Sequence, residues 1–229
     1  MAETERRHDQ PLAGTITALE VQARDPQRVN VFLDGRFAFG LSARVVGDAG
    51  LKPGDALGAS QVATLLQQEA AQQALQQAFA YLGYRPRSEH ELRRYLAQRG
   101  HAPETVDAVL GRLAEYHYVD DEVFALSWVE NRQKFRPRGA RLLRAELRQK
   151  GVERDVAEQA IADLGGDERA LALAAAQKKL PTLEVADYQA FGRRLAGFLQ
   201  RRGFPPDVVW DVVRELWAAR SGETPPPPE

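Results

Sequence analysis

The chain contains no cysteine among its 229 residues. This absence excludes disulfide bonds, thiolate-bound zinc and cysteine nucleophiles. No apolar run approaches the ~20 residues that a membrane-spanning helix needs. The first residues, MAETERRHDQPLAG, are charged and lack the apolar core of a secretory signal. We therefore expect a cytoplasmic protein.

The sequence also lacks the patterns that mark a catalytic site. Its four histidines, His8, His90, His101 and His117, show no ligand spacing. The glycine-rich stretch GLKPGDALG does not have the lysine–serine pattern of a phosphate-binding loop, and there is no serine nucleophile elbow. We predict that the protein is not an enzyme and that it has no cofactor.

Residues 14–57 are typical of a small β-element. The stretches TITALEVQ, VNVFL and FAFGLS are rich in β-branched and aromatic residues. Asp34-Gly35 lies between two of them and predicts a tight hairpin, because a two-residue turn needs positive φ angles that glycine accepts. Pro53-Gly54 marks a further turn. We expect three to five strands that rest on the segment that follows.

The pattern becomes helical from Ser60, a candidate N-cap, and stays helical to about Arg220. Within this region LAQRG, LRQKG and LQRRG occur at 96–100, 147–151 and 199–203, at spacings of 51 and 52 residues. When the three final glycines are aligned, leucines stand eight and four residues before each of them, and an acidic residue stands four residues after. These leucines are Leu92, Leu143, Leu195, Leu96, Leu147 and Leu199, and the acids are Glu104, Asp155 and Asp207.

This spacing predicts a helix, a glycine turn and a second helix. Leucines four apart share one helix face. The glycine ends the helix in a left-handed conformation that a residue without Cβ adopts easily. The cation before each glycine complements the C-terminal end of one helix dipole, and the acid complements the N-terminal end of the next. Further helices are expected upstream of each corner, so that each unit has three helices.

The predicted fold is therefore mostly α. It is a tandem array of three three-helix, helix-turn-helix-like repeats after a small N-terminal β-element, with neighbouring repeats packed together. The expected segments are a flexible tail at 1–11, the β-element at 12–59, helical repeats at 60–119, 120–166 and 167–221, and a proline-rich tail at 222–229.

Positive charge is concentrated in the second repeat. Between Arg132 and Arg154 there are nine cationic and two acidic residues, a local charge of +7 in a chain of net charge −1. Arg141, Arg144 and Arg148 are spaced to share one helix face, and such a face suits phosphate. Arginine-rich helix faces are also common as merely solvated surface. Phe135 beside them could stack on a base or fasten its loop to the core.

Two polar motifs have simpler structural interpretations. Asp120-Asp121-Glu122 resembles a metal-binding cluster, but these acids fall at a predicted helix start, where N-capping accounts for them. Ser88 followed by Glu91 forms a capping box. We therefore predict no metal site.

Three motifs resemble those of the RecX family, bacterial regulators of the RecA recombinase. They are RPRSEHEL at 85–92, YVDDEVFA at 118–125 and GARLLRAELRQKGV at 139–152. The resemblance is strong over about 75–164 and looser over the third repeat. It implies a modular protein that binds the RecA–DNA filament along its groove and inhibits ATP hydrolysis, filament growth and strand exchange. Many such proteins also bind single- or double-stranded DNA.

The resemblance assigns motif positions, which we interpret mostly as caps and turns: Arg85, Arg87, Ser88, Asp120, Asp121, Gly139 and Gly151. For contact with the recombinase or DNA we expect the cations Arg132, Lys134, Arg136, Arg138, Arg141, Arg144, Arg148 and Lys150. The main alternative is a transcriptional regulator that binds duplex DNA directly through the helix-turn-helix-like repeats. A pure scaffold for other proteins is a second alternative.

Overall fold

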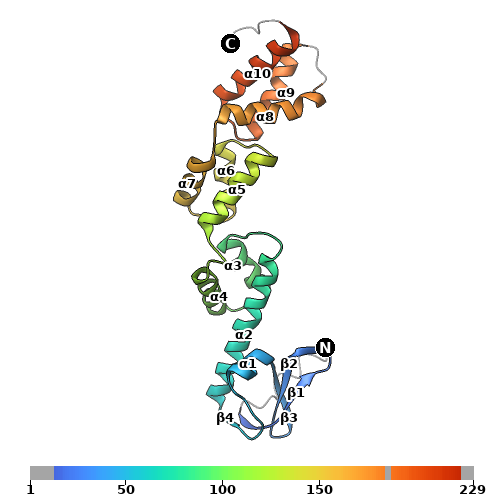
Figure 1. Ribbon diagram of the computed structural model, residues 1–229, viewed down its shortest axis with the longest axis vertical. Helices are drawn as coiled ribbons and strands as arrows, with labels where there is room; N and C mark the ends of the chain where they lie inside the picture. Colours follow the sequence, from blue (N-terminus) through green and yellow to red (C-terminus); the bar gives the residue numbers. More distant parts are fainter. Residues whose placement is uncertain (1–12, 184–186, 223–229) are drawn as a thin grey trace. The chain divides into compact units, whose positions relative to one another are not determined.

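The computed structural model describes residues 13–183 and 187–222. The predicted tail at 1–11, and the predicted tail at 222–229 apart from Gly222, lie outside these residues. The chain folds into two compact units. The first holds the described residues up to Arg85 together with Leu92–Glu115, and the second holds Pro86–Glu91 together with the described residues from Tyr116 onward (Figure 1).

The N-terminal element is a four-stranded antiparallel sheet in the order β3-β2-β1-β4. Its strands are β1 (Gly14–Gln22), β2 (Asp25–Leu33), β3 (Arg36–Ser42) and β4 (Ala56–Leu57), and the short helix α1 (Ala43–Asp48) follows β3. The predicted hairpin is confirmed, since Asp34 and Gly35 between β2 and β3 have φ angles of 49° and 77°. The sheet residues Ile16, Val31, Leu33 and Leu41 are buried at 0–1% exposure.

Helix α2 (Ala59–Leu82) belongs to both the sheet and the first repeat. Its N-terminal half adds Val62 and Leu65 to the core of the sheet. In the same helix Glu69 is buried and binds both Arg28, at 2.8 Å, and the backbone N–H of Ser42, at 2.6 Å. The β-element therefore rests on the helix that follows it, as the sequence suggested.

The predicted N-cap of this helix was wrong. Gly58, and not Ser60, is the N-cap, and its N–H donates to Gln61 Oε1 at 2.8 Å. The carbonyl of Gly58 accepts the first helical hydrogen bond, from Val62. Gln61 thus supplies the side-chain acceptor, so the helix can begin one residue before the serine.

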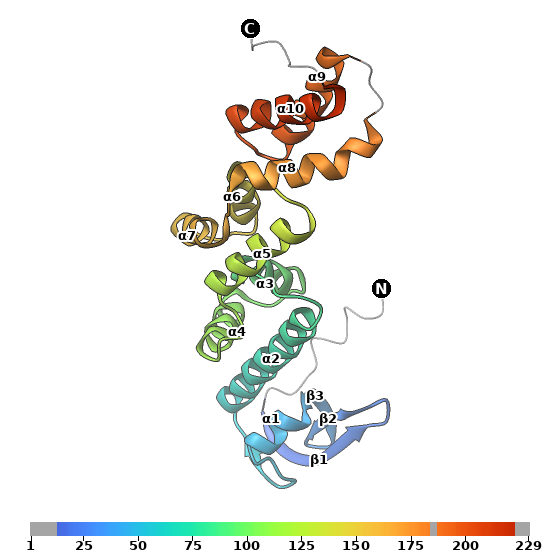
Figure 2. The same ribbon diagram turned by 45° about the horizontal axis from the view of Figure 1, so that its top comes forward.

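Three groups of three helices follow the sheet within the described residues. The first repeat comprises α2, α3 (Glu89–Gln98) and α4 (Pro103–Glu115); the second comprises α5 (Asp121–Phe135), α6 (Ala140–Gln149) and α7 (Arg154–Leu164); the third comprises α8 (Glu168–Lys179), a 3₁₀ turn (Leu180–Thr182), α9 (Tyr188–Arg201) and α10 (Pro206–Ser221). In the third repeat α8 packs against both α9 and α10 (Figure 2). The predicted fold class of three three-helix repeats after a strand element is confirmed.

The repeated five-residue phrase builds the corner of each repeat. The six aligned leucines are buried at 0–1% exposure. Gly100, Gly151 and Gly203 have φ angles of 85°, 79° and 88°, which are left-handed as expected. Glu104, Asp155 and Asp207 lie in the first turn of the next helix. The spacing of the leucines and the position of the glycine in the sequence therefore predict the helix pair at each corner.

Candidate nucleic-acid interface

The second unit contains a joint between the first turn of α3 and the corner of the second repeat. The Ser88 hydroxyl is fully buried and donates to the carbonyl of Lys150 at 2.6 Å. It also accepts from the N–H of Glu91 at 3.2 Å, which is the serine half of the predicted capping box. The Glu91 carboxylate pairs with the Lys150 ammonium at 2.7 Å. Ser88 therefore caps its own helix and fastens it to the next repeat.

An equivalent joint connects the second repeat to the third. Gly139 stands twelve residues before Gly151, as Ser88 stands twelve before Gly100. Its N–H donates to the carbonyl of Arg202 at 2.9 Å. A Cβ on Gly139 would overlap the backbone of Gly203. At this motif position a bare backbone takes the place of the buried hydroxyl.

The start of α5 carries the acidic motif, and its two aspartates accept hydrogen bonds from backbone N–H groups at helix starts. Asp120 accepts from the backbone N–H groups of Glu122 and Val123 at 2.9 and 3.0 Å. Asp121 accepts from the N–H of Glu89 at 2.9 Å, which ties α5 to the first turn of α3. Burial is the main cause that raises the pKa of Asp121, and the charges of nearby acids add to it. Across the described residues, no group of three or more His, Cys, Asp or Glu side chains is arranged to hold a metal ion.

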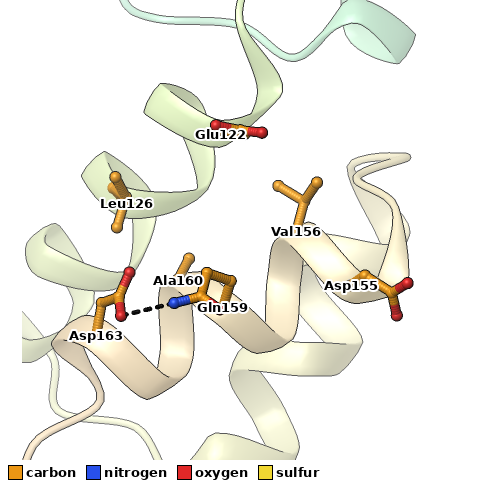
Figure 3. Close-up of a pocket in the computed structure, with 7 residues that line it drawn as sticks. All are labelled: Glu122, Leu126, Asp155, Val156, Gln159, Ala160 and Asp163. Carbon is orange, nitrogen blue, oxygen red and sulfur yellow. Dashed lines mark hydrogen bonds between the residues drawn. The ribbon is translucent and has the colours of Figure 1, made fainter.

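A hollow with acidic residues lies between α5 and α7 of the same repeat (Figure 3). The hollow has a volume of about 310 Å³ and apolar walls from Leu126, Val156 and Ala160, with acidic residues beside them. Asp163 accepts from Gln159 at 2.8 Å. The acidic residues of the hollow contrast in charge with the arginine-rich loop and helix α6 of the same repeat.

The predicted cations divide into two groups, and the first group is internal. Glu146 on α6 accepts from Trp128 Nε1 and Arg132 Nε, each at 2.9 Å, and it also pairs with Arg138. The Arg132 guanidinium lies 4.1 Å from the centre of the Trp128 ring, and the Lys150 ammonium lies 5.0 Å from it. Burial lowers the pKa of Arg132. Arg132, Arg138 and Lys150 therefore hold the second repeat together.

The second group faces outward. Arg144 pairs with Glu158 across two exposed helix surfaces, at 2.8 Å. Arg141 donates to the carbonyl of Gln200 in the third repeat at 3.0 Å. The remaining members, Lys134, Arg136 and Arg148, are exposed. This group is the part of the predicted set that a partner can reach.

Phe135 and two motif arginines lie outside these two groups. Phe135 is 61% exposed, so it does not fasten its loop to the core. The motif residues Arg85 and Arg87 lie half-buried in the connection between α2 and α3.

Sequence reasoning missed the contribution of the corner cations. They were expected to complement the helix dipole, and Lys150 was also expected to contact the recombinase or DNA. Lys150 also pairs with Glu91, and Arg202 donates to the carbonyl of Pro137 at 3.2 Å. The signal was present in the alignment, because both residues occupy the position just before the corner glycine.

These features define a class: an antiparallel sheet followed by three-helix repeats, in which Ser88 and Gly139, at the starts of two middle helices, each hydrogen-bond the corner of the repeat that follows in sequence. Four sequence models of one family match the chain in order. They are the RecX N-terminal domain at residues 14–57 and the first, second and third RecX three-helix domains at 74–113, 120–161 and 167–213. The chain belongs to the RecX family of regulatory proteins.

Relatives and solved structures agree with this assignment. The chain is 32% identical over 203 residues to a regulatory protein RecX of Clostridium botulinum, covering 87% of this chain and 95% of the other. It is 36% identical over 154 residues to the one of Amycolatopsis mediterranei, covering 67% and 88%. A crystal structure of a regulatory protein RecX matches with a TM-score of 0.66 at 24% identity, covering 89% of this chain and 99% of the other. This last likeness concerns the fold.

Within the described residues, no helix has the length and apolar character needed to cross a membrane.

Proposed function

We propose that this protein is a non-enzymatic regulator that binds the RecA–DNA filament. It inhibits ATP hydrolysis by the filament, filament growth and strand exchange. The array spans more than one recombinase subunit and favours one filament state or caps the filament end. Its basic surface on the second repeat contacts DNA phosphates or an acidic part of the filament.

The observation that carries this proposal is the outward cationic group in a member of the RecX family. Arg141, Arg144 and Arg148 are exposed on α6, and Lys134 and Arg136 are exposed in the segment before it. Exposed cations can exchange counterions for phosphates, whereas the cations bound to Glu146 cannot leave without exposing a partly buried carboxylate.

The first test is ATP hydrolysis by RecA filaments preformed on single-stranded DNA. The protein is added well below one copy per recombinase subunit. Strong inhibition at this ratio supports the proposal, because capping or groove blocking needs few molecules. No inhibition, even with the protein in excess, would refute the proposal. The alternative would then be a regulator that binds duplex DNA directly. Salt-dependent binding to duplex DNA in the absence of recombinase would test that alternative.

The surface is tested with the double variant Arg141→Glu/Arg144→Glu. We expect inhibition to weaken about tenfold or more, because two charges reverse on the contacting face. The matched control is Arg112→Glu/Arg193→Glu, in which both arginines are exposed on helices outside the basic surface. Circular dichroism should show unchanged helicity in both. Equal inhibition by the two variants would show that α6 does not contact the filament.

A further inference from the structure

Four arginines surround one small hollow where the second repeat meets the third. Arg136 and Arg138 come from the loop between α5 and α6, and Arg201 and Arg202 come from the end of α9. Leu142 supplies an apolar wall, and the hollow has a volume of about 380 Å³. None of the described residues that line it is acidic. Two repeats therefore bring their positive charge to one place.

Two of these arginines are held in position by the protein. The Arg202 guanidinium donates to the carbonyl of Pro137 at 3.2 Å and lies 4.6 Å from the centre of the Phe198 ring. Arg138 is anchored by Glu146. Arg136 and Arg201 are exposed, so their side chains can turn toward a ligand. The hollow thus has a fixed base and an adjustable rim.

Positive charge is crowded in this hollow, although Glu146 pairs with Arg138. Burial lowers the pKa of Arg138, and the charges of Arg132, Arg202 and Arg136 lower it further. Burial and the charge of Arg136 lower the pKa of Arg202. Both directions mean that the cationic forms are poorly solvated and repel one another. An anion in the hollow would offset the repulsion between these cations.

We propose that this hollow binds one phosphate group, with Arg138 and Arg202 as the fixed base and Arg136 and Arg201 closing over the phosphate oxygens. The proposal deepens the proposed function and rests on it in one respect, that the phosphate is supplied by the nucleic-acid backbone. Inorganic phosphate or a nucleotide presents the same chemistry, so the experiment must separate these sources.

The number of guanidinium groups favours phosphate over an acidic side chain. A guanidinium is a planar fork that donates two parallel hydrogen bonds. A carboxylate has two oxygens in one plane and is satisfied by one or two such forks. A phosphate group accepts from several directions and carries more acceptor capacity, which matches cations arriving from two different repeats.

The test uses the full chain with Arg136→Gln/Arg201→Gln, since the side chains of both residues are exposed at the rim. The control is Arg112→Gln/Arg193→Gln, which removes the same charge from exposed positions away from the hollow. Binding to a labelled single strand of about 30 nucleotides is followed by fluorescence anisotropy over a salt series. At about 50 mM salt we expect the rim variant to bind about tenfold more weakly or worse, with a salt slope smaller by about one, and the control to change less than about threefold.

A second measurement identifies the source of the phosphate. Inorganic phosphate, compared with chloride at equal ionic strength, should raise the thermal midpoint of the wild type and of the control but not that of the rim variant. Loss of both the phosphate effect and the DNA affinity supports a site for the nucleic-acid backbone. Loss of the phosphate effect with unchanged DNA affinity supports a site for free phosphate or nucleotide.

Three outcomes overturn the proposal. The rim variant and the wild type could behave alike in both assays; the control could lose as much DNA affinity as the rim variant; or the rim variant could lose only its binding to recombinase without DNA, which would indicate an acidic protein segment instead. The ATPase titration keeps the two proposals apart. Phosphate binding without inhibition of the recombinase would refute the proposed function alone, and inhibition without phosphate binding would refute the hollow alone.

Discussion

The corner at Gly100 has the same backbone as the corners at Gly151 and Gly203 but different surroundings. All three glycines are left-handed. A Cβ on Gly151 would overlap His90, and a Cβ on Gly203 would overlap Leu142, which in each case belongs to the start of the preceding middle helix. A Cβ on Gly100 would meet no described atom within 4 Å apart from those of its chain neighbours. In the first repeat the corner glycine therefore only forms the turn. In the second and third repeats it forms the turn and also leaves room for a residue that packs closely against it.

The largest effect is expected from Gly139→Ala. Gly139 has φ −73°, which alanine adopts freely, so any cost is steric. The new Cβ would overlap the Gly203 backbone, and we expect a loss of about 2–4 kcal/mol in the free energy of unfolding. Chemical denaturation measures it. Gly58→Ala is the control, because Gly58 is also a helix N-cap and its Cβ would meet Gln61 at an ordinary 3.6 Å. Equal losses at the two glycines would contradict the tight joint.

The next effect comes from alanine at the covered and uncovered corners. Gly100→Ala should cost only about 1 kcal/mol, the penalty of a left-handed alanine. Gly151→Ala should cost more, by about 1–2 kcal/mol, because it also displaces His90. Denaturation midpoints of the two variants give the difference. His90→Gly should recover part of the Gly151→Ala loss in a double-mutant cycle, and additive losses would show that His90 does not press on this corner.

A smaller effect is expected from Ser88→Ala. The variant loses one helix cap and one buried hydrogen bond to the Lys150 carbonyl, together about 1–2 kcal/mol. Hydrogen exchange should speed up in both the first turn of α3 and the corner after α6. Faster exchange in α3 alone would mean that the serine is only a cap.

The smallest effect concerns Asp121, which joins α5 to the Glu89 N–H. Its folded-state pKa is raised, so the folded protein binds the proton more tightly than the unfolded chain does. The stabilisation linked to that proton is complete below the unfolded pKa near 3.8 and is lost as pH rises through the folded pKa. Asp121→Asn should therefore match or exceed the wild type in stability at pH 7, and this advantage should shrink as pH falls toward 4. Thermal melts from pH 3.5 to 7.5 test this, and an advantage that grows with acidity would refute it.

The sequence was most informative where one residue type has one use. Left-handed glycines, leucines four apart and the Asp34-Gly35 turn depend on local geometry, and each was predictable. The prediction of Ser60 as the N-cap was wrong because the Gln61 side chain accepts from the Gly58 N–H and the helix begins at Ala59. Residue propensities alone do not predict this contact. The basic set was predicted as one surface, yet the structure draws Arg132, Arg138 and Lys150 inward around Glu146 and Trp128. That division depends on contacts between separate helices, which spacing along the chain does not encode.

The meeting of arginines from two repeats could not be predicted from the sequence either. Arg201 and Arg202 belong to a phrase that was interpreted as a helix end. They lie beside Arg136 and Arg138 where the Gly139 N–H binds the carbonyl of Arg202 and the loop of the second repeat meets the corner of the third. The motif glycine is thus what assembles the arginine hollow, although it contributes no side chain to it.

The third repeat begins its middle helix differently from the other two. Helix α9 starts at Tyr188, a turn earlier than α3 and α6 relative to the corner glycine, with Asp187 as its N-cap. The position that is Ser88 or Gly139 in the earlier repeats is Phe191, which is fully buried in its own core. A copied repeat added after α10 would therefore find no bare helix start to receive its corner. Joining a further repeat through the same contact would therefore require a different start of α9.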